Sequence, residues 1–163
     1  MKTEPIIFNS KGYLVPNLNI RTDIATLERE FVNNLNSEKR KSLFGFYTAY
    51  SDRLKSALGN VALLQWIDGS FATKKPDPGD FDVVTFINHD VVKGSEDLLS
   101  DFKYPNSLGN FGIDGYIVLE YPRDHTNYPL YIGDRAYWMD LFDKTRRNRN
   151  GVKYPKGFIE VLF

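Results

Sequence analysis

Two apolar runs on either side of a proline-bearing loop constrain this chain more than any other feature of its sequence. Residues 61–67 and 80–87 are short and dominated by aliphatic and aromatic side chains, a composition typical of buried strands. The segment between them, 69–79, contains Pro76 and Pro78, which keep it out of regular structure. The sequence therefore predicts a strand, an irregular loop and a second strand.

The remaining patterns predict helices and further strands around this unit. Apolar spacing and capping residues indicate helices at 23–36 and from Ser37 to the Gly59-Asn60 pair. We expect further helices at 90–102 and 134–142, strands at 113–121 and 158–163, and loops at 104–112, 128–133 and 143–156. The predicted fold is a single α/β (α+β) domain, with an N-terminal arm at 1–21, helices at about 23–58, a sheet at about 61–121, and a C-terminal helix and strand at about 134–163.

Three aspartates form the candidate catalytic group. Asp80 and Asp82 are two residues apart at the start of a predicted strand, so their side chains should project to the same side. Paired carboxylates repel one another unless a cation lies between them, and Mg²⁺ (or Mn²⁺) prefers such oxygen ligands. Asp114, at the start of the strand at 113–121, is the candidate third metal ligand, with Glu120 as the alternative. Asp114 is also the expected helper in deprotonating an attacking hydroxyl.

The residues before this pair suit phosphate binding. Gly69 would let the backbone approach a phosphate, and the Ser70 hydroxyl and nearby N–H groups could bind its oxygens. Lys74 and Lys75 would neutralise a triphosphate. A Gly-Ser pair alone is usually a turn, and a lone Asp-x-Asp is usually a solvated strand end. Their order along one strand–loop–strand unit favours a functional site.

Composition excludes several classes of function. The chain has no cysteine, which excludes disulfides, thiolate catalysis and cysteine-ligated zinc and suits a reducing cytoplasm. Its 21 Lys and Arg residues balance 21 Asp and Glu residues, which argues against an extended surface that follows nucleic-acid phosphates. The first apolar run, 6–8, is too short for a signal peptide or a membrane span, so we expect a cytoplasmic protein without a membrane partner.

The spacing of Gly69-Ser70 and Asp80-Phe81-Asp82 resembles the signature of the DNA polymerase β-like nucleotidyltransferases. The longer stretch 65–84 looks more specifically like DUF6932, a small bacterial and phage family. Similarity to that family extends to residues 12–16, 114–125, 134–138 and 155–160. The resemblance implies a nucleotidyltransferase-like mixed β-sheet flanked by α-helices and places the superfamily's roles on Gly69, Ser70, Asp80, Asp82 and Asp114. Pro76 and Pro78 depart from the superfamily pattern, in which a helix often follows the Gly-Ser turn.

The resemblance implies Mg²⁺-dependent transfer of a nucleoside monophosphate from a nucleoside triphosphate such as ATP to a hydroxyl on a protein, a tRNA or a small molecule. Members of this size often belong to toxin–antitoxin or phage-defence modules. The alternatives are a silent nucleotide-binding regulator of the same fold and a nucleic-acid-binding module. Residues that could contact an acceptor are His125, Arg146, Arg147 and Arg149. A partner protein or a homodimer could supply the acceptor-binding surface that a chain of 163 residues leaves little room for.

Overall fold

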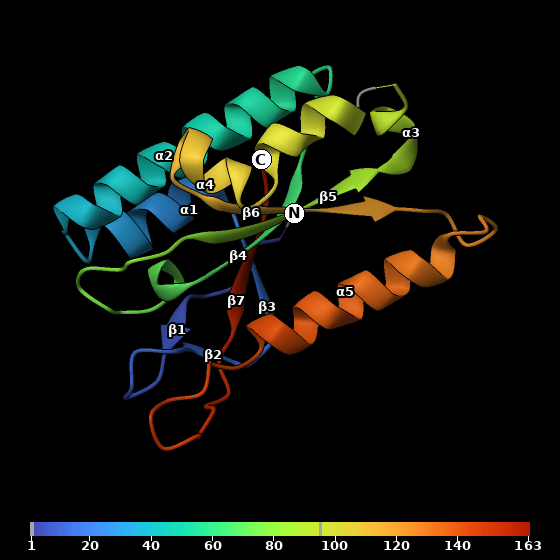
Figure 1. Cartoon of the computed structure of the whole chain (residues 1–163). Coiled ribbons are helices and arrows are strands. Elements are labelled where there is room, and N and C mark those ends of the chain that lie inside the picture. The colour runs from blue at the N-terminus through green and yellow to red at the C-terminus, as the bar shows by residue number, and fades with distance from the viewer. Residues whose placement is uncertain (1, 95) are drawn as a thin grey trace.

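A five-stranded mixed sheet forms the centre of the protein, as seen in a computed structural model that describes residues 2–94 and 96–163 (Figure 1). The strand order is β3-β7-β4-β5-β6. The two outer pairs, β3 with β7 and β5 with β6, are parallel, and β4 is antiparallel to both of its neighbours. The strands are β3 (Asn19–Thr22), β4 (Leu64–Asp68), β5 (Asp82–Asn88), β6 (Asp114–Glu120) and β7 (Phe158–Leu162).

Helices cover both faces of this sheet. One face packs against α1 (Ile24–Glu28), the π-helical turn η1 (Arg29–Asn33), α2 (Glu38–Ala57), η3 (Glu96–Phe102) and α4 (Asn106–Phe111). The other face packs against α5 (Tyr128–Phe142) through a smaller apolar cluster around Trp66 and Phe158 (Figure 1). β5 is buried along nearly its whole length, since it lies between β4 and β6 and is covered on both faces. The predicted α/β single domain with a mixed sheet is confirmed.

Several element boundaries differ from the predictions. The N-terminal arm contains the hairpin β1 (Ile7–Phe8) and β2 (Leu14–Val15), and its last part joins the main sheet as β3. The continuous helix expected at 90–102 is wrong, because α3 (His89–Val92) ends before Gly94, which has a left-handed φ of 81°. Ser95, which that prediction included, lies outside the described residues. The loop expected at 104–112 contains α4.

α5 begins six residues earlier than predicted, at Tyr128 rather than at Asp134. Apolar residues lie all around this helix, so the sequence lacks the one-sided periodicity that marks a surface helix. Pro129 lies in its first turn, where proline is compatible with a helix. Within the described residues, no helix is both long and apolar enough to cross a membrane.

Candidate active site

Three carboxylates lie in one row across neighbouring strands. Asp68, the last residue of β4, is directly opposite Asp82, the first residue of β5, and Asp82 is directly opposite Asp114, the first residue of β6. Residues that face one another across strands project from the same side of a sheet. All three side chains therefore lie on the side of the sheet that α5 covers. Strand register brings Asp82 and Asp114 together, as the sequence predicted, and adds Asp68.

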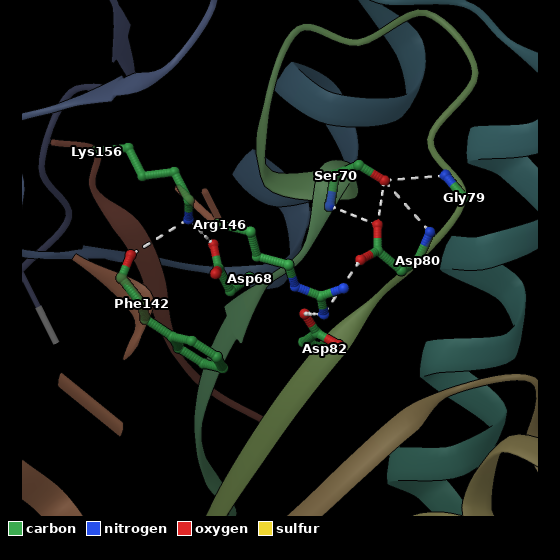
Figure 2. A network of polar contacts seen from close by, with 8 residues as sticks. All are labelled: Asp68, Ser70, Gly79, Asp80, Asp82, Phe142, Arg146 and Lys156. Carbon is green, nitrogen blue, oxygen red and sulfur yellow. Dashed lines mark hydrogen bonds and ion pairs between the residues drawn. The ribbon is translucent and has the colours of Figure 1, made fainter. Parts of the chain in front are cut away.

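Asp80 joins this row from just outside β5. One nitrogen of the Arg146 guanidinium, Nη2, lies 3.9 Å from Oδ2 of Asp80 and 3.9 Å from Oδ2 of Asp82. The two carboxylates therefore face the same point in space, and in Figure 2 the Arg146 side chain lies between them and Asp68. The predicted proximity of Asp80 and Asp82 is confirmed.

The electrostatic environment of Asp82 is unfavourable to its charge. The pKa of Asp82 is raised to about 8, chiefly by burial and in addition by the nearby carboxylates of Asp80, Asp68 and Asp114. Oδ1 of Asp82 and Oδ1 of Asp114 are both buried and have no hydrogen-bond partner among the described residues. Buried carboxylate oxygens without partners are costly, and a bound cation would satisfy them.

The Gly-Ser turn supports Asp80 directly. The Ser70 backbone N–H donates to Oδ1 of Asp80 over 2.8 Å, and the Ser70 hydroxyl also donates to that oxygen (Figure 2). The same hydroxyl oxygen accepts the backbone N–H groups of Gly79, at 2.9 Å, and Asp80, at 3.3 Å. The Ser70 donors expected to bind phosphate thus hold Asp80 in place here. A phosphate contact through Ser70 stays a prediction and requires that Asp80 release these donors.

Gly69 is required for this turn by its backbone. Its φ is 78°, a left-handed value that favours glycine, and a Cβ there would lie 3.0 Å from the Asp80 carbonyl oxygen and 3.1 Å from the Asp82 nitrogen. The close approach of Gly69 in this structure is to the chain's own backbone, and its approach to a phosphate stays a prediction.

A buried arginine holds the loop that follows. Arg40, on α2, donates from Nη1 to the carbonyls of Phe31 and Phe71, at 3.1 and 2.9 Å, and from Nη2 to those of Thr73 and Lys75, at 2.5 and 2.6 Å. Three of these four carbonyls belong to the loop between β4 and β5. Burial lowers the pKa of Arg40 to about 10, which leaves it charged at neutral pH. The loop begins with one 3-10 turn, η2 (Ser70–Ala72), and is otherwise irregular, as its prolines predicted, and this arginine holds it in place.

Asp68, Asp80 and Asp82 line a cavity of about 720 Å³ that also contains many cationic side chains. Its walls come from the turn of the N-terminal hairpin, the loop after β4 and the segment after α5. The basic side chains that line it are Lys11, Lys74, Lys75, Lys144, Arg146 and Lys156. Lys74 and Lys75 therefore lie where the sequence predicted, beside the aspartates. A cavity that joins carboxylates to a surplus of cations suits a phosphorylated ligand accompanied by a metal ion.

Two lining residues that sequence reasoning missed are Asp68 and Lys156. They form a buried ion pair, with the Lys156 ammonium donating to Oδ1 of Asp68 and, over 3.2 Å, to the carbonyl oxygen of Phe142 (Figure 2). Burial raises the pKa of Asp68 to about 6 even though the Lys156 charge acts to lower it. An acid at the end of an apolar strand was the available signal for Asp68. No sequence signal pointed to Lys156, since it lies 88 residues from Asp68 along the chain.

The predicted acceptor-binding residues are only partly brought together. Arg146 lines the cavity, whereas Arg147 and Arg149 are exposed and, within the described chain, lie outside its lining. Glu120, the alternative third acid, lies at the opposite end of β6 and accepts a hydrogen bond from the Tyr131 hydroxyl. Asp114 therefore remains the candidate third metal ligand.

His125 lies at the opposite end of the sheet from the carboxylates, and its contact with an acceptor stays a prediction. It follows the end of β6, whereas Asp114 begins that strand, so a seven-residue strand of about 3.3 Å per residue separates them. His125 packs instead against His89 and Tyr121, with both ring centroids 4.6 Å from its own. Because β5 and β6 pair in parallel, the segments that follow both strands lie at the same end of the sheet, which places His125 beside His89 and away from Asp114.

The three candidate ligands have donor atoms that suit a divalent cation, but their present positions do not form a complete metal site. Asp80, Asp82 and Asp114 supply only oxygen donors, and two of these oxygens are buried without partners. Over residues 2–94 and 96–163, however, no three His, Asp or Glu side chains are already arranged to hold an ion. Ser70 and Arg146 engage Asp80 in the position where a cation would bind. Binding of Mg²⁺ or Mn²⁺ therefore stays a prediction, and it requires Asp80 to turn.

Comparison with protein families places residues 6–162 in a family of unknown function, DUF6932, and the chain belongs to that family. Neither the curated proteins nor the solved structures contain a match to the chain.

Proposed function

We propose that this protein is a divalent-cation-dependent nucleotidyltransferase of the DNA polymerase β-like type. The observation that carries the proposal is the row of carboxylates at the starts of β5 and β6, with unpaired buried oxygens on Asp82 and Asp114, beside a cation-lined cavity. The order of a strand, Gly69-Ser70, an Asp-x-Asp strand and a third Asp on a parallel strand supports the same class.

The residues then take distinct roles in one transfer. An acceptor hydroxyl oxygen forms a bond to the α-phosphorus of a nucleoside triphosphate, the bond from that phosphorus to the bridging oxygen breaks, and pyrophosphate leaves. Asp114 accepts the hydroxyl proton. Asp80, Asp82 and Asp114 would hold Mg²⁺ or Mn²⁺, which supplies charge neutralisation for the phosphates and acidifies the hydroxyl. Lys74 and Lys75 would bind the departing phosphates, and Ser70, once Asp80 has turned away from it, would donate to a phosphate oxygen.

Cavity lining supports an orientation for the two substrates. Asp68, Asp80 and Asp82 line the cationic cavity, whereas Asp114, one strand further along the sheet, lies outside its lining in the described chain. The triphosphate therefore occupies the side toward β4, and the acceptor hydroxyl approaches from the side of β6.

The test is transfer of label from each α-³²P nucleoside triphosphate, with Mg²⁺ or Mn²⁺, to protein or RNA in a cell extract. Wild type is expected to transfer label, whereas Asp82→Asn and Asp114→Asn are expected to lose transfer. Asp101→Asn, which changes an exposed aspartate away from the site, is the matched control and should behave as wild type. Equal labelling by wild type and Asp82→Asn would contradict the proposal.

One observation favours a second candidate, a nucleotide-binding protein without turnover. Arg146 lies 3.9 Å from both Asp80 and Asp82 and provides positive charge at that point without a metal. This candidate predicts that nucleoside triphosphates bind while no label is transferred to any acceptor, and that Asp82→Asn leaves nucleotide binding unchanged.

A further inference from the structure

Lys156 has one unused donor at the floor of the cavity. The residue is only 6% exposed, yet it lines the cavity. A lysine ammonium carries three N–H donors. Two of them serve Asp68 and the Phe142 carbonyl, and no other acceptor in the described part of the chain takes the third. A buried charged donor without a partner is costly, so the cavity is the place where that donor finds one.

The position of Lys156 relates it to the carboxylate row. Its partner Asp68 is directly opposite Asp82, and Asp114 lies on the far side of Asp82, so the ammonium binds the carboxylate at the β4 end of the row. Figure 2 shows Lys156 and Asp68 on one side of Arg146, with Asp80 and Asp82 on the other. The ammonium therefore faces the part of the cavity that the triphosphate would occupy.

Its surroundings hold the ammonium in place. Phe142 is the last residue of α5, a helix of 15 residues, and the carbonyl end of a helix attracts positive charge. Asp68 supplies a full negative charge on the other side. The Asp68–Lys156 pair is neutral as a unit and holds the ammonium in a fixed position. Its third N–H is therefore already in place, unlike a donor on a flexible surface side chain.

We propose that Lys156 is a phosphate-binding residue that donates its third N–H to a non-bridging oxygen of the bound nucleoside triphosphate. This inference rests on the proposed function for the identity of the ligand. Asp68 and the Phe142 carbonyl act as positioning groups for the ammonium. Lys74, Lys75 and Arg146 are exposed at the mouth of the cavity, so Lys156 is the buried cation that the ligand meets at its floor.

The test compares two variants that differ only in the ammonium. Lys156→Met alone would leave Asp68 buried and unpaired, which could prevent folding. We therefore compare Asp68→Asn, which keeps Lys156, with the double variant Asp68→Asn/Lys156→Met, in which neither residue is charged. Isothermal titration calorimetry measures the affinity of each for inorganic tripolyphosphate and for ATP, with EDTA present to remove divalent cations.

The expected result is that Asp68→Asn binds both ligands at least as tightly as wild type, because a competing negative charge is gone. The double variant should bind both about 10-fold or more weakly, the effect of one charge-assisted hydrogen bond. Equal affinities of the two variants would overturn the proposal, as would a wild type that binds neither ligand. An effect on tripolyphosphate alone would overturn the assignment to a nucleotide.

These outcomes are separate from the test of the proposed function. The calorimetry requires no metal and no turnover, so Lys156-dependent phosphate binding can be established even where the labelling experiment detects no transfer. In that case the transferase proposal fails and the phosphate-binding residue stands. Conversely, label transfer with unchanged affinity in the double variant removes Lys156 from the site and leaves the transferase proposal in place.

Discussion

Replacing Arg40 is expected to loosen the wall of the cavity. Its guanidinium serves four backbone carbonyls, of which those of Phe31 and Phe71 are reached through fully buried hydrogen bonds and those of Thr73 and Lys75 through partly buried ones. Water can replace the partly buried bonds after a substitution, but it cannot reach the other two. The expected cost therefore comes mainly from the Phe31 and Phe71 carbonyls.

The expected loss of stability follows from the two fully buried carbonyls. A buried carbonyl left without a partner costs about 1–3 kcal/mol, so Arg40→Met should lower the free energy of unfolding by about 2–6 kcal/mol. Arg40→Lys keeps the charge but has only three donors for four carbonyls, so it should cost about 1–3 kcal/mol. The Lys variant is the more informative, since it tests the geometry of the guanidinium rather than the presence of a charge.

Urea unfolding measures both effects. The matched control is Arg53→Lys, an exposed arginine on the same helix, which should leave the midpoint nearly unchanged. Limited trypsin digestion is the second readout, because a released loop should be cut faster between Lys74 and Lys75. If Arg40→Lys unfolds at the same urea concentration as Arg53→Lys and is cut no faster, the four hydrogen bonds do not hold the loop and this reasoning is refuted.

Three further predictions concern the site itself. Gly69→Ala should cost about 1–3 kcal/mol, because its φ of 78° and the close backbone leave no room for a Cβ; urea unfolding against Gly133→Ala, where a Cβ meets open space, checks this. The pKa of Asp82 is raised to about 8 in the folded state, whereas it is about 3.9 in the unfolded chain. Between these two pH values the folded state keeps a proton on Asp82 that the unfolded state has lost. Stability should therefore fall as pH rises from about 4 to about 8 and change little above that; Asp82→Asn should flatten the fall, and equal pH profiles by urea unfolding would contradict the assignment. Arg146→Ala should change the free energy of unfolding by less than about 1 kcal/mol, because this side chain is 84% exposed, and a larger loss by the same measurement would show that its contacts with the aspartates stabilise the fold.

Local patterns were enough to predict the strand–loop–strand unit and the pair Asp80 and Asp82. A strand places alternate residues on one side whatever it pairs with, so the joint projection of these two carboxylates depends only on local geometry. The requirement for glycine at residue 69 is equally local, because a left-handed φ favours glycine whatever the rest of the fold. Placing Asp114 beside them from sequence alone depended on the resemblance and on its position at the start of an apolar run.

The contacts between residues far apart in the sequence were determined by the tertiary structure alone. Parallel pairing of β5 and β6 sets Asp82 opposite Asp114, and the same pairing sends His125 to the other end of the sheet. The ion pair of Asp68 and Lys156 exists because β7 returns beside β4, with the chain before it crossing the end of α5. Periodicity along the chain determines which face of an element is buried, whereas strand order and register are determined by the packing of the whole core. The sequence by itself thus specified the acidic strand and its turn, and the fold assembled the cationic cavity around them.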